Sequence, residues 1–185
     1  MKLKLPAVFG LLVLAAAVSV DATTVRRLAN EEMTNEADLI VIGKAIESHV
    51  QWIDRALYTI VTVEVSETLK GAPDHQIRIA LPGGIDSNRK FPVAMSYAGA
   101  PTLALQEQAF LFLENGEDTG GAYAIVGFSQ GKFSIVADQA GVKRVSRDLT
   151  PVQVQDADGV TRGTRTFEPL ADFVDEIRGH LQSGQ

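Results

Sequence analysis

The chain has 185 residues, contains no cysteine and carries a formal net charge of −6. The lack of cysteine excludes disulfides, thiol catalysis, cysteine-ligated zinc and a lipid attached to an N-terminal cysteine. The acidic balance argues against a nucleic-acid partner and against electrostatic docking on anionic lipid, because both need clustered Lys and Arg.

Residues 1–22 have the pattern of a secretory signal peptide. Lys2 and Lys4 form a positive n-region, Ala7–Val18 is almost wholly apolar, and Ala22 offers a small residue at the cleavage position. An N-terminal membrane helix is the alternative, but the apolar run is shorter than the ~20 residues that span a bilayer. The sequence therefore predicts an exported protein, periplasmic or extracellular, with no stable membrane anchor and a single domain over residues 23–185.

The first half of this domain shows a helix followed by strands. Leu28–Ala37 is predicted as a short helix with Asn30 as its N-cap. Asp38–Ser48 is predicted as a strand buried on both faces, because residues 39–42 are all apolar. Leu57–Leu69 alternates as a half-buried strand does, and Gln76–Leu81 repeats the alternation. The predicted inward face of the longer strand comprises Leu57, Val61, Val63, Val65 and Leu69.

The second half contains shorter strands and a final helix. Strands are predicted over Ala109–Leu113, Tyr123–Phe128 and Lys132–Val136, with a turn at Gly116–Gly121 between the first two. Asp138–Thr166 is polar, with a hairpin signal at Asp158-Gly159. The chain ends in an amphipathic helix from Pro169 to about Leu181, with Pro169 in the first helical position.

Catalytic and metal-binding patterns are weak. His49, His75 and His180 do not share the spacing of a zinc site, and Asp156–Gly159 lacks the later carboxylates of a calcium loop. Gly127–Gly131 has the letters of a G-x-S-x-G nucleophile elbow around Ser129, but strand-like residues follow where that motif needs a helix. A turn is the preferred interpretation, and we expect neither a cofactor nor a metal.

The long connection Pro82–Gln106 is the best candidate for a binding loop, because it shows no periodicity and long loops in compact domains are usually functional or mobile. The alternative is that its aromatic side chains fold onto the barrel. Trp52 is either an exposed binding anchor or folded back on the core. The candidate binding residues are Arg89, Lys90, Phe91, Met95 and Tyr97, with Thr23, Thr24 and Trp52 as weaker candidates.

Two segments, Asn35–Ala45 and Tyr58–Gly71, together resemble the opening of the netrin-like module of tissue inhibitors of metalloproteinases. The shared pattern is an Ala-Asp entry into a buried strand and a second strand that ends in Lys-Gly. The resemblance implies an OB-type five-stranded barrel with helices packed outside. The family's inhibitory N-terminal cysteine has no counterpart at Thr23-Thr24-Val25. The chain also resembles uncharacterised exported bacterial proteins that share the hairpin Gly127–Phe133.

The sequence thus predicts a mostly β protein: an OB-like antiparallel barrel of five to six strands with a short N-terminal helix and a C-terminal amphipathic helix. Because no catalytic constellation is evident, we expect an exported binding module rather than an enzyme. Its partner would be an extracytoplasmic protein, with an extracellular protease as one class. A carbohydrate or small-ligand binder is the first alternative, and a hydrolase the second.

Overall fold

The structure is a computed structural model that describes residues 23–116 and 119–184. It is mostly β, with two helices in those ranges, which confirms the predicted fold class. The signal peptide predicted over residues 1–22 lies outside the described residues, as does part of the turn predicted at Gly116–Gly121. The elements are β1 (Thr24–Arg26), α1 (Asn30–Glu36), β2 (Leu39–Ile53), β3 (Ala56–Lys70), β4 (Gln76–Pro82), β5 (Gly84–Asp86), β6 (Val93–Met95), β7 (Gln108–Asn115), β8 (Tyr123–Ile125), β9 (Lys132–Ala137), β10 (Lys143–Asp148), β11 (Gln153–Asp156), β12 (Gly159–Arg162), β13 (Arg165–Pro169) and α2 (Leu170–Ser183).

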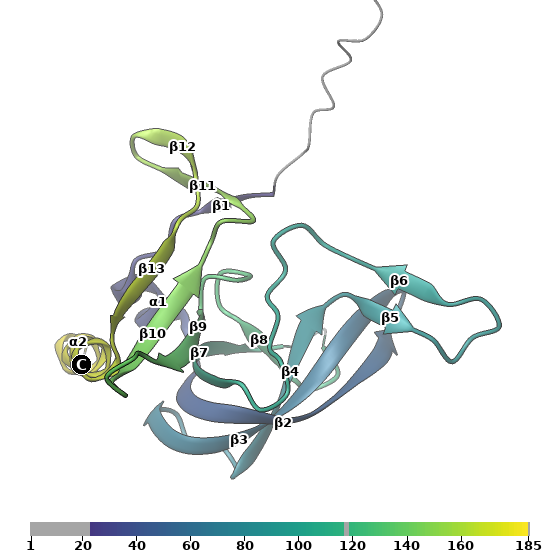
Figure 1. Cartoon of the computed structure of the whole chain (residues 1–185), viewed down its shortest axis with the longest axis horizontal. Helices are drawn as coiled ribbons and strands as arrows, with labels where there is room; N and C mark the ends of the chain where they lie inside the picture. The colour runs from purple at the N-terminus through teal and green to yellow at the C-terminus, as the bar shows by residue number, and fades with distance from the viewer. Residues whose placement is uncertain (1–22, 117–118, 185) are drawn as a thin grey trace, which may run out of the picture.

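Five strands form a closed ring in the order β2, β3, β4, β8, β7 and back to β2 (Figure 1). The junction between β4 and β8 is parallel and consists of one pair, Ile79 with Tyr123, whereas the others are antiparallel. Strand directions cannot alternate all the way around a ring of five, because five is odd. One parallel junction is therefore the smallest departure from the antiparallel arrangement that the sequence predicts.

The first half of β2 and most of β7 are buried on both faces, because the ring lies on one side of them and the helices on the other. Val41 and Leu111 point into the ring, where they meet Val61 and Val63 of β3. Ile40 points the other way, towards α1 and α2. This arrangement confirms the prediction that residues 39–42 form a strand buried on both faces.

Four phenylalanines form the centre of the core on the helix side. Phe110 and Phe112 come from β7, Phe133 from β9 and Phe173 from α2, and their ring centroids lie 4.6–6.5 Å apart. All four side chains are at most 1 % exposed. The outward continuation of the sheet through β9, β10 and β13 thus shares one core with the C-terminal helix.

The predicted inward face of β3 is confirmed for Val61 and Val63, but it is wrong for Leu69. The ladder between β2 and β3 pairs Val41 with Thr68 and Ile40 with Lys70, so Leu69 is an unpaired bulge residue. An extra residue in one strand reverses the side-chain alternation beyond it. Leu69 consequently packs against the helix-side core instead of inside the ring.

The helix ends differ slightly from the prediction. α1 begins at Asn30 with Ala29 at the N-cap, so Asn30 is not the cap residue. The Glu32 carboxylate accepts the Ala29 backbone N–H at 2.9 Å and satisfies one of the free donors of the first turn. Pro169 lies at the N-cap position of α2 and not in its first turn. The buried face of α2 includes Phe173 and Ile177, as its amphipathic pattern predicts.

The polar segment Asp138–Thr166 is more ordered than its sequence indicates. It contributes β10 to the large sheet and forms the hairpin β11–β12, in which Asp156 pairs with Gly159. The hairpin signal at Asp158-Gly159 is therefore confirmed. β1 runs parallel to β11, so the N-terminal end of the described chain joins this hairpin.

Candidate functional site

Part of the predicted binding loop Pro82–Gln106 forms an ordered arm, whereas residues 96–106 remain an irregular connection. Residues 84–95, which comprise β5, β6 and the turn between them, form an antiparallel hairpin that we call the binding arm. It projects from the ring beside the far ends of β2 and β3 (Figure 1). The sequence lacks a strand signal here because each strand is only three residues long.

The arm leaves the ring at Gly83, whose φ of +98° is accessible to glycine and rare for other residues. A Cβ at this position would lie 2.8 Å from the carbonyl oxygen of Met95. The Gly83 N–H donates to the Leu57 carbonyl at 2.8 Å, and the Thr59 hydroxyl donates to the Gly83 carbonyl at 2.9 Å. The root of the arm is thus tied to β3.

A three-residue latch holds the arm against the β2–β3 hairpin. The Trp52 indole N–H donates to Asp86 Oδ2 at 2.7 Å, and Arg89 Nε donates to the same oxygen at 2.9 Å. The Arg89 guanidinium carbon also lies 4.6 Å from the centroid of the Trp52 ring. Trp52 is half-buried in this contact, so it is neither a free anchor nor a member of the core clusters.

The latch favours the ionised form of its central carboxylate. Hydrogen bonds from the Trp52 indole, the Asn88 backbone N–H and the Arg89 side chain lower the pKa of Asp86 below its ordinary value of 3.8. The Asp86 side chain is 13 % exposed. The carboxylate therefore stays charged at neutral pH, and the contact between the two hairpins persists.

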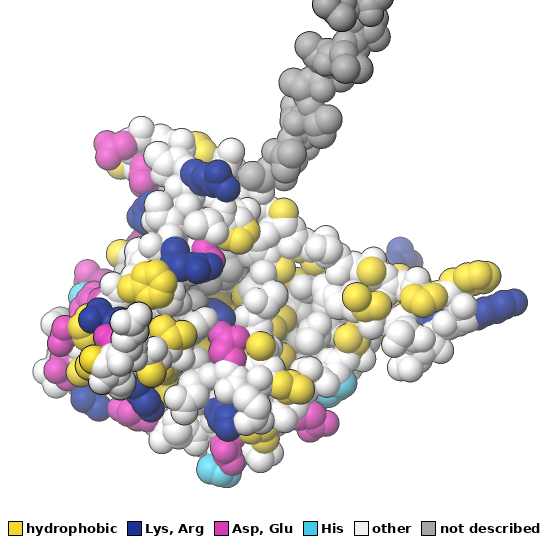
Figure 2. Space-filling model, viewed as in Figure 1, with side chains coloured by type: hydrophobic (Ala, Val, Ile, Leu, Met, Phe, Trp, Pro, Cys, Tyr) yellow, Lys and Arg dark blue, Asp and Glu magenta, His cyan; other side chains and the backbone are white. Residues whose placement is uncertain are grey.

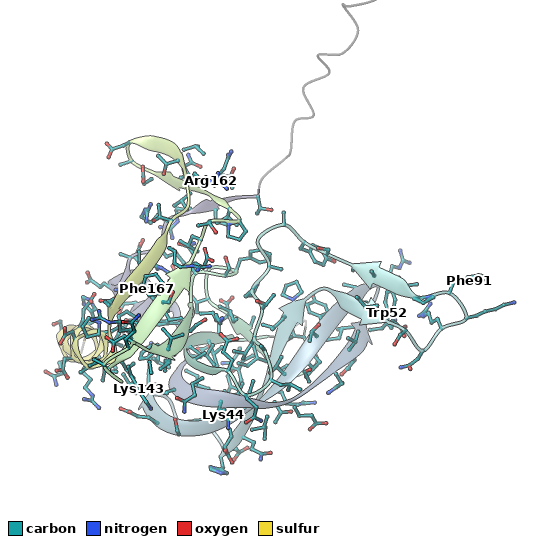
Figure 3. All side chains as sticks on the ribbon, in the orientation of Figure 1. Lys44, Trp52, Phe91, Lys143, Arg162 and Phe167 are labelled. Atoms are coloured by element: carbon teal, nitrogen blue, oxygen red, sulfur yellow. The ribbon has the colours of Figure 1, made fainter. Side chains whose placement is uncertain are left out.

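The structure divides the five predicted binding residues between two roles. Phe91 is 75 % exposed at the end of the arm, with the Lys90 ammonium 5.8 Å from its ring centroid, and Tyr97 is 44 % exposed (Figure 3). Arg89 belongs to the latch, and Met95 is structural, because its sulfur accepts the Leu57 backbone N–H at 3.3 Å. Phe91 is therefore displayed at the end of the arm, and Tyr97, two residues beyond the arm, is also exposed.

Sequence reasoning missed two exposed apolar residues on the arm and at its base. Ile85 on β5 is 64 % exposed, and Val50 at the end of β2 is 38 % exposed. Apolar side chains lie along the arm, with cationic side chains at its end (Figure 2). A three-residue strand cannot show a period of two, so the outward direction of Ile85 could not be predicted.

The weaker candidates Thr23 and Thr24 lie away from the arm. Thr24 pairs with Gln153 across the β1–β11 junction, and the Thr23 carbonyl accepts the Gln153 backbone N–H at 2.9 Å. The structure therefore does not bring these residues together with Phe91. They serve to join the N-terminal segment to β11.

The segment Gly127–Gly131 forms a turn between β8 and β9, as predicted. Its buried residue is Gln130, which accepts the Leu28 backbone N–H at 2.9 Å and donates to the Arg26 carbonyl at 2.7 Å. A strand follows Ser129, so the geometry of a nucleophile elbow is not present. The turn Gly127–Gly131 thus fastens the N-terminal segment to the sheet.

Two further observations concern residues 23–116 and 119–184. Within them, His, Asp and Glu side chains form no cluster of three or more that could hold a metal ion. None of the helices there combines the length and apolarity required to cross a bilayer. The arm, its latch and its exposed apolar residues are the features of this site that bear on function.

Comparison of the chain with family models, curated proteins and solved structures found no match.

Proposed function

We propose that this protein is an exported, non-catalytic binding module that binds another extracytoplasmic protein through its binding arm. The pattern of residues 1–22 supports export. The observation that carries the binding proposal is the 75 % exposure of Phe91 at the end of an ordered hairpin. An aromatic side chain exposed to this extent offers a large apolar area for burial in a complex.

The latch makes the arm suited to binding, because it fixes the arm before a partner arrives. Association costs less when an interface segment is already ordered, since side-chain and loop ordering otherwise oppose it. Trp52, Asp86 and Arg89 supply this order without using Phe91, Ile85 or Tyr97. Aromatic residues are the side chains that most often act as binding hot spots.

The chemistry of the arm defines the kind of partner. Lys90 makes the end of the arm positive in a chain with a net charge of −6, because the charge of Arg89 is balanced by Asp86. A projecting apolar side chain beside a cation fits a concave apolar pocket with an acidic rim. Substrate clefts of extracellular proteases are concave surfaces of this kind, and the resemblance to netrin-like inhibitor modules supports this class of partner.

The test is capture of partners from the native extracytoplasmic fraction by the immobilised chain. Phe91→Ala should abolish capture of the specific partner, because the central anchor is lost. Phe167→Ala is the matched control, since Phe167 is also exposed, at 57 %, but lies on β13, far from the arm (Figure 3). Trp52 is the chain's one tryptophan, so its fluorescence reports partner binding beside the arm.

Capture that survives Phe91→Ala, or that is lost equally with Phe167→Ala, would contradict the proposal. If the captured protein is a protease, inhibition by the wild-type chain and not by Phe91→Ala would place the arm in its cleft. If it is not a protease, the binding proposal stands and the partner class is changed.

A further inference from the structure

A cavity of about 140 Å³ lies against the segment that links the arm to β7, because residues 99–102 of that segment line it. We call it the hydroxyl pocket, because Thr102, Ser129, Ser134 and Ser146 line it. Gly99, Pro101 and Pro151 supply apolar wall. It is large enough to hold several waters or one small polar group, but it is smaller than a site that encloses a drug-sized ligand.

One side of the pocket is a rigid charged cluster. Lys132 Nζ lies 2.5 Å from Glu107 Oε1 and 2.7 Å from Ser134 Oγ, and Ser134 Oγ donates to Glu107 Oε1 at 2.7 Å. Partial burial acts to raise the pKa of Glu107, but hydrogen bonds from Lys132, the Ala104 N–H and Ser134 lower it overall. Glu107 is thus a carboxylate that accepts hydrogen bonds from both Lys132 and Ser134.

The other groups of the pocket remain available to a ligand. The hydroxyls of Thr102, Ser129 and Ser146 make no hydrogen bond to the described part of the chain, and two of the three ammonium protons of Lys132 are used. Asp148 forms an ion pair with Arg165, and its Oδ1 accepts the Thr150 hydroxyl at 2.7 Å. The pocket therefore presents free donors and acceptors together with the Asp148 carboxylate.

The backbone at the pocket is strained in two places. Phe128, next to Ser129, has a φ of +67°, and Gln106, next to Glu107, has a φ of +70°. Positive φ is rare for residues other than glycine, and holding it costs conformational energy. Such strain clusters at ligand sites, where the surrounding structure holds a useful but unfavourable conformation.

We propose that the hydroxyl pocket binds the hydroxyl-bearing edge of a neutral sugar ring. Sugar hydroxyls both donate and accept, which matches serine and threonine hydroxyls, an ammonium proton and a carboxylate in one cavity. A carboxylate or phosphate ligand can only accept hydrogen bonds, so it could not donate to the Asp148 carboxylate as a sugar hydroxyl can. The proposal concerns a different surface from the binding arm and does not rest on the proposed function.

The test is a titration of the ¹⁵N-labelled chain with glucose, mannose and N-acetylglucosamine, and separately with sodium acetate at matched ionic strength. At least one sugar should give saturable amide shifts near residues 101–103, 129–134 and 146–150. Ser146→Ala should weaken that binding about fivefold, the loss expected for one neutral hydrogen bond. Ser87→Ala is the matched control, because Ser87 is exposed on the arm.

Thermal unfolding of each variant shows whether a loss of sugar binding comes from a loss of folding. Ser129→Ala is a second variant for this purpose, because Ser129 lies in a turn and its hydroxyl is free of protein partners. Phe91→Ala should leave sugar binding unchanged. The proposal is overturned if no sugar gives saturable shifts, if acetate binds as tightly as the best sugar, or if both serine variants bind that sugar with unchanged affinity.

Discussion

The body of the molecule and the binding arm are held together by different forces. In the body, the first half of β2 and most of β7 are buried on both faces, and the four phenylalanines that define the helix-side core are at most 1 % exposed. In the arm, Ile85 and Phe91 are more than half exposed, and order comes from the contact of Trp52 with Asp86 and Arg89. Apolar burial stabilises the first region, whereas polar contacts fix the second and leave its apolar residues free.

The largest difference is expected between two phenylalanine variants. Phe110→Ala should lower the free energy of unfolding by about 3–5 kcal/mol, because it removes a fully buried ring and leaves a cavity. Phe91→Ala should change it by less than about 0.5 kcal/mol, since the ring is exposed. Denaturant midpoints measure both changes. A comparable loss for Phe91→Ala would mean that the arm packs on the body.

A smaller difference is expected between neighbours on β3. Val63 is fully buried in the ring, so Val63→Ala should cost about 1–3 kcal/mol. Glu64 is exposed on the other face, with His75 Nε2 at 3.5 Å, and an exposed ion pair contributes little. Glu64→Ala should therefore change the free energy of unfolding by under about 0.5 kcal/mol. Equal losses in urea unfolding would show that the faces of β3 are not divided between core and solvent.

The smallest expected effect is local to the arm and depends on pH. Hydrogen bonds, of which the one from Trp52 contributes most, lower the pKa of Asp86 in the folded chain. The contribution of Asp86 to stability is therefore complete above pH 3.8, the ordinary pKa of an Asp side chain. It is lost as the pH falls through the lower pKa that Asp86 has in the folded chain. Trp52 fluorescence should stay constant on acidification to pH 3.8 and change only below it.

Asp86→Asn provides the control for this titration. An asparagine side chain can still accept the Trp52 N–H, but it neither titrates nor forms an ion pair with Arg89. The acid-induced fluorescence change should therefore disappear in this variant. A change centred above pH 5, or one that Asp86→Asn retains, would show that another group controls the arm.

The sequence predicted the body well because burial imposes a pattern on consecutive residues. The apolar run at residues 39–42, the alternation through Val61 and Val63 and the amphipathic α2 all lie where they were expected. β10 was missed because it reads as polar: its inward face consists of Val145 and of Arg147, whose guanidinium lies 5.0 Å from the Phe133 ring centroid. A buried arginine gives no hydrophobic signal.

The arm was predicted as a binding segment, but its construction was not. Trp52 and Asp86 are 34 positions apart, and nothing in either neighbourhood indicates that an indole and a carboxylate meet. The assignment of Arg89 and Met95 to structural roles depends on that meeting and on the approach of Met95 to Leu57. The hydroxyl pocket is equally distributed, since its residues come from four separate segments.

The two hydrogen bonds that Gln130 makes with the N-terminal segment have a consequence for the order in which the chain can fold. Gln130 holds the Arg26 carbonyl from 104 positions away, and β1 pairs with a strand that ends at Asp156. Contacts between distant residues form late, because loop-closure entropy must first be overcome. The N-terminal segment leaves the ribosome first, but it therefore cannot pair with β11 or bond to Gln130 until most of the chain has been synthesised.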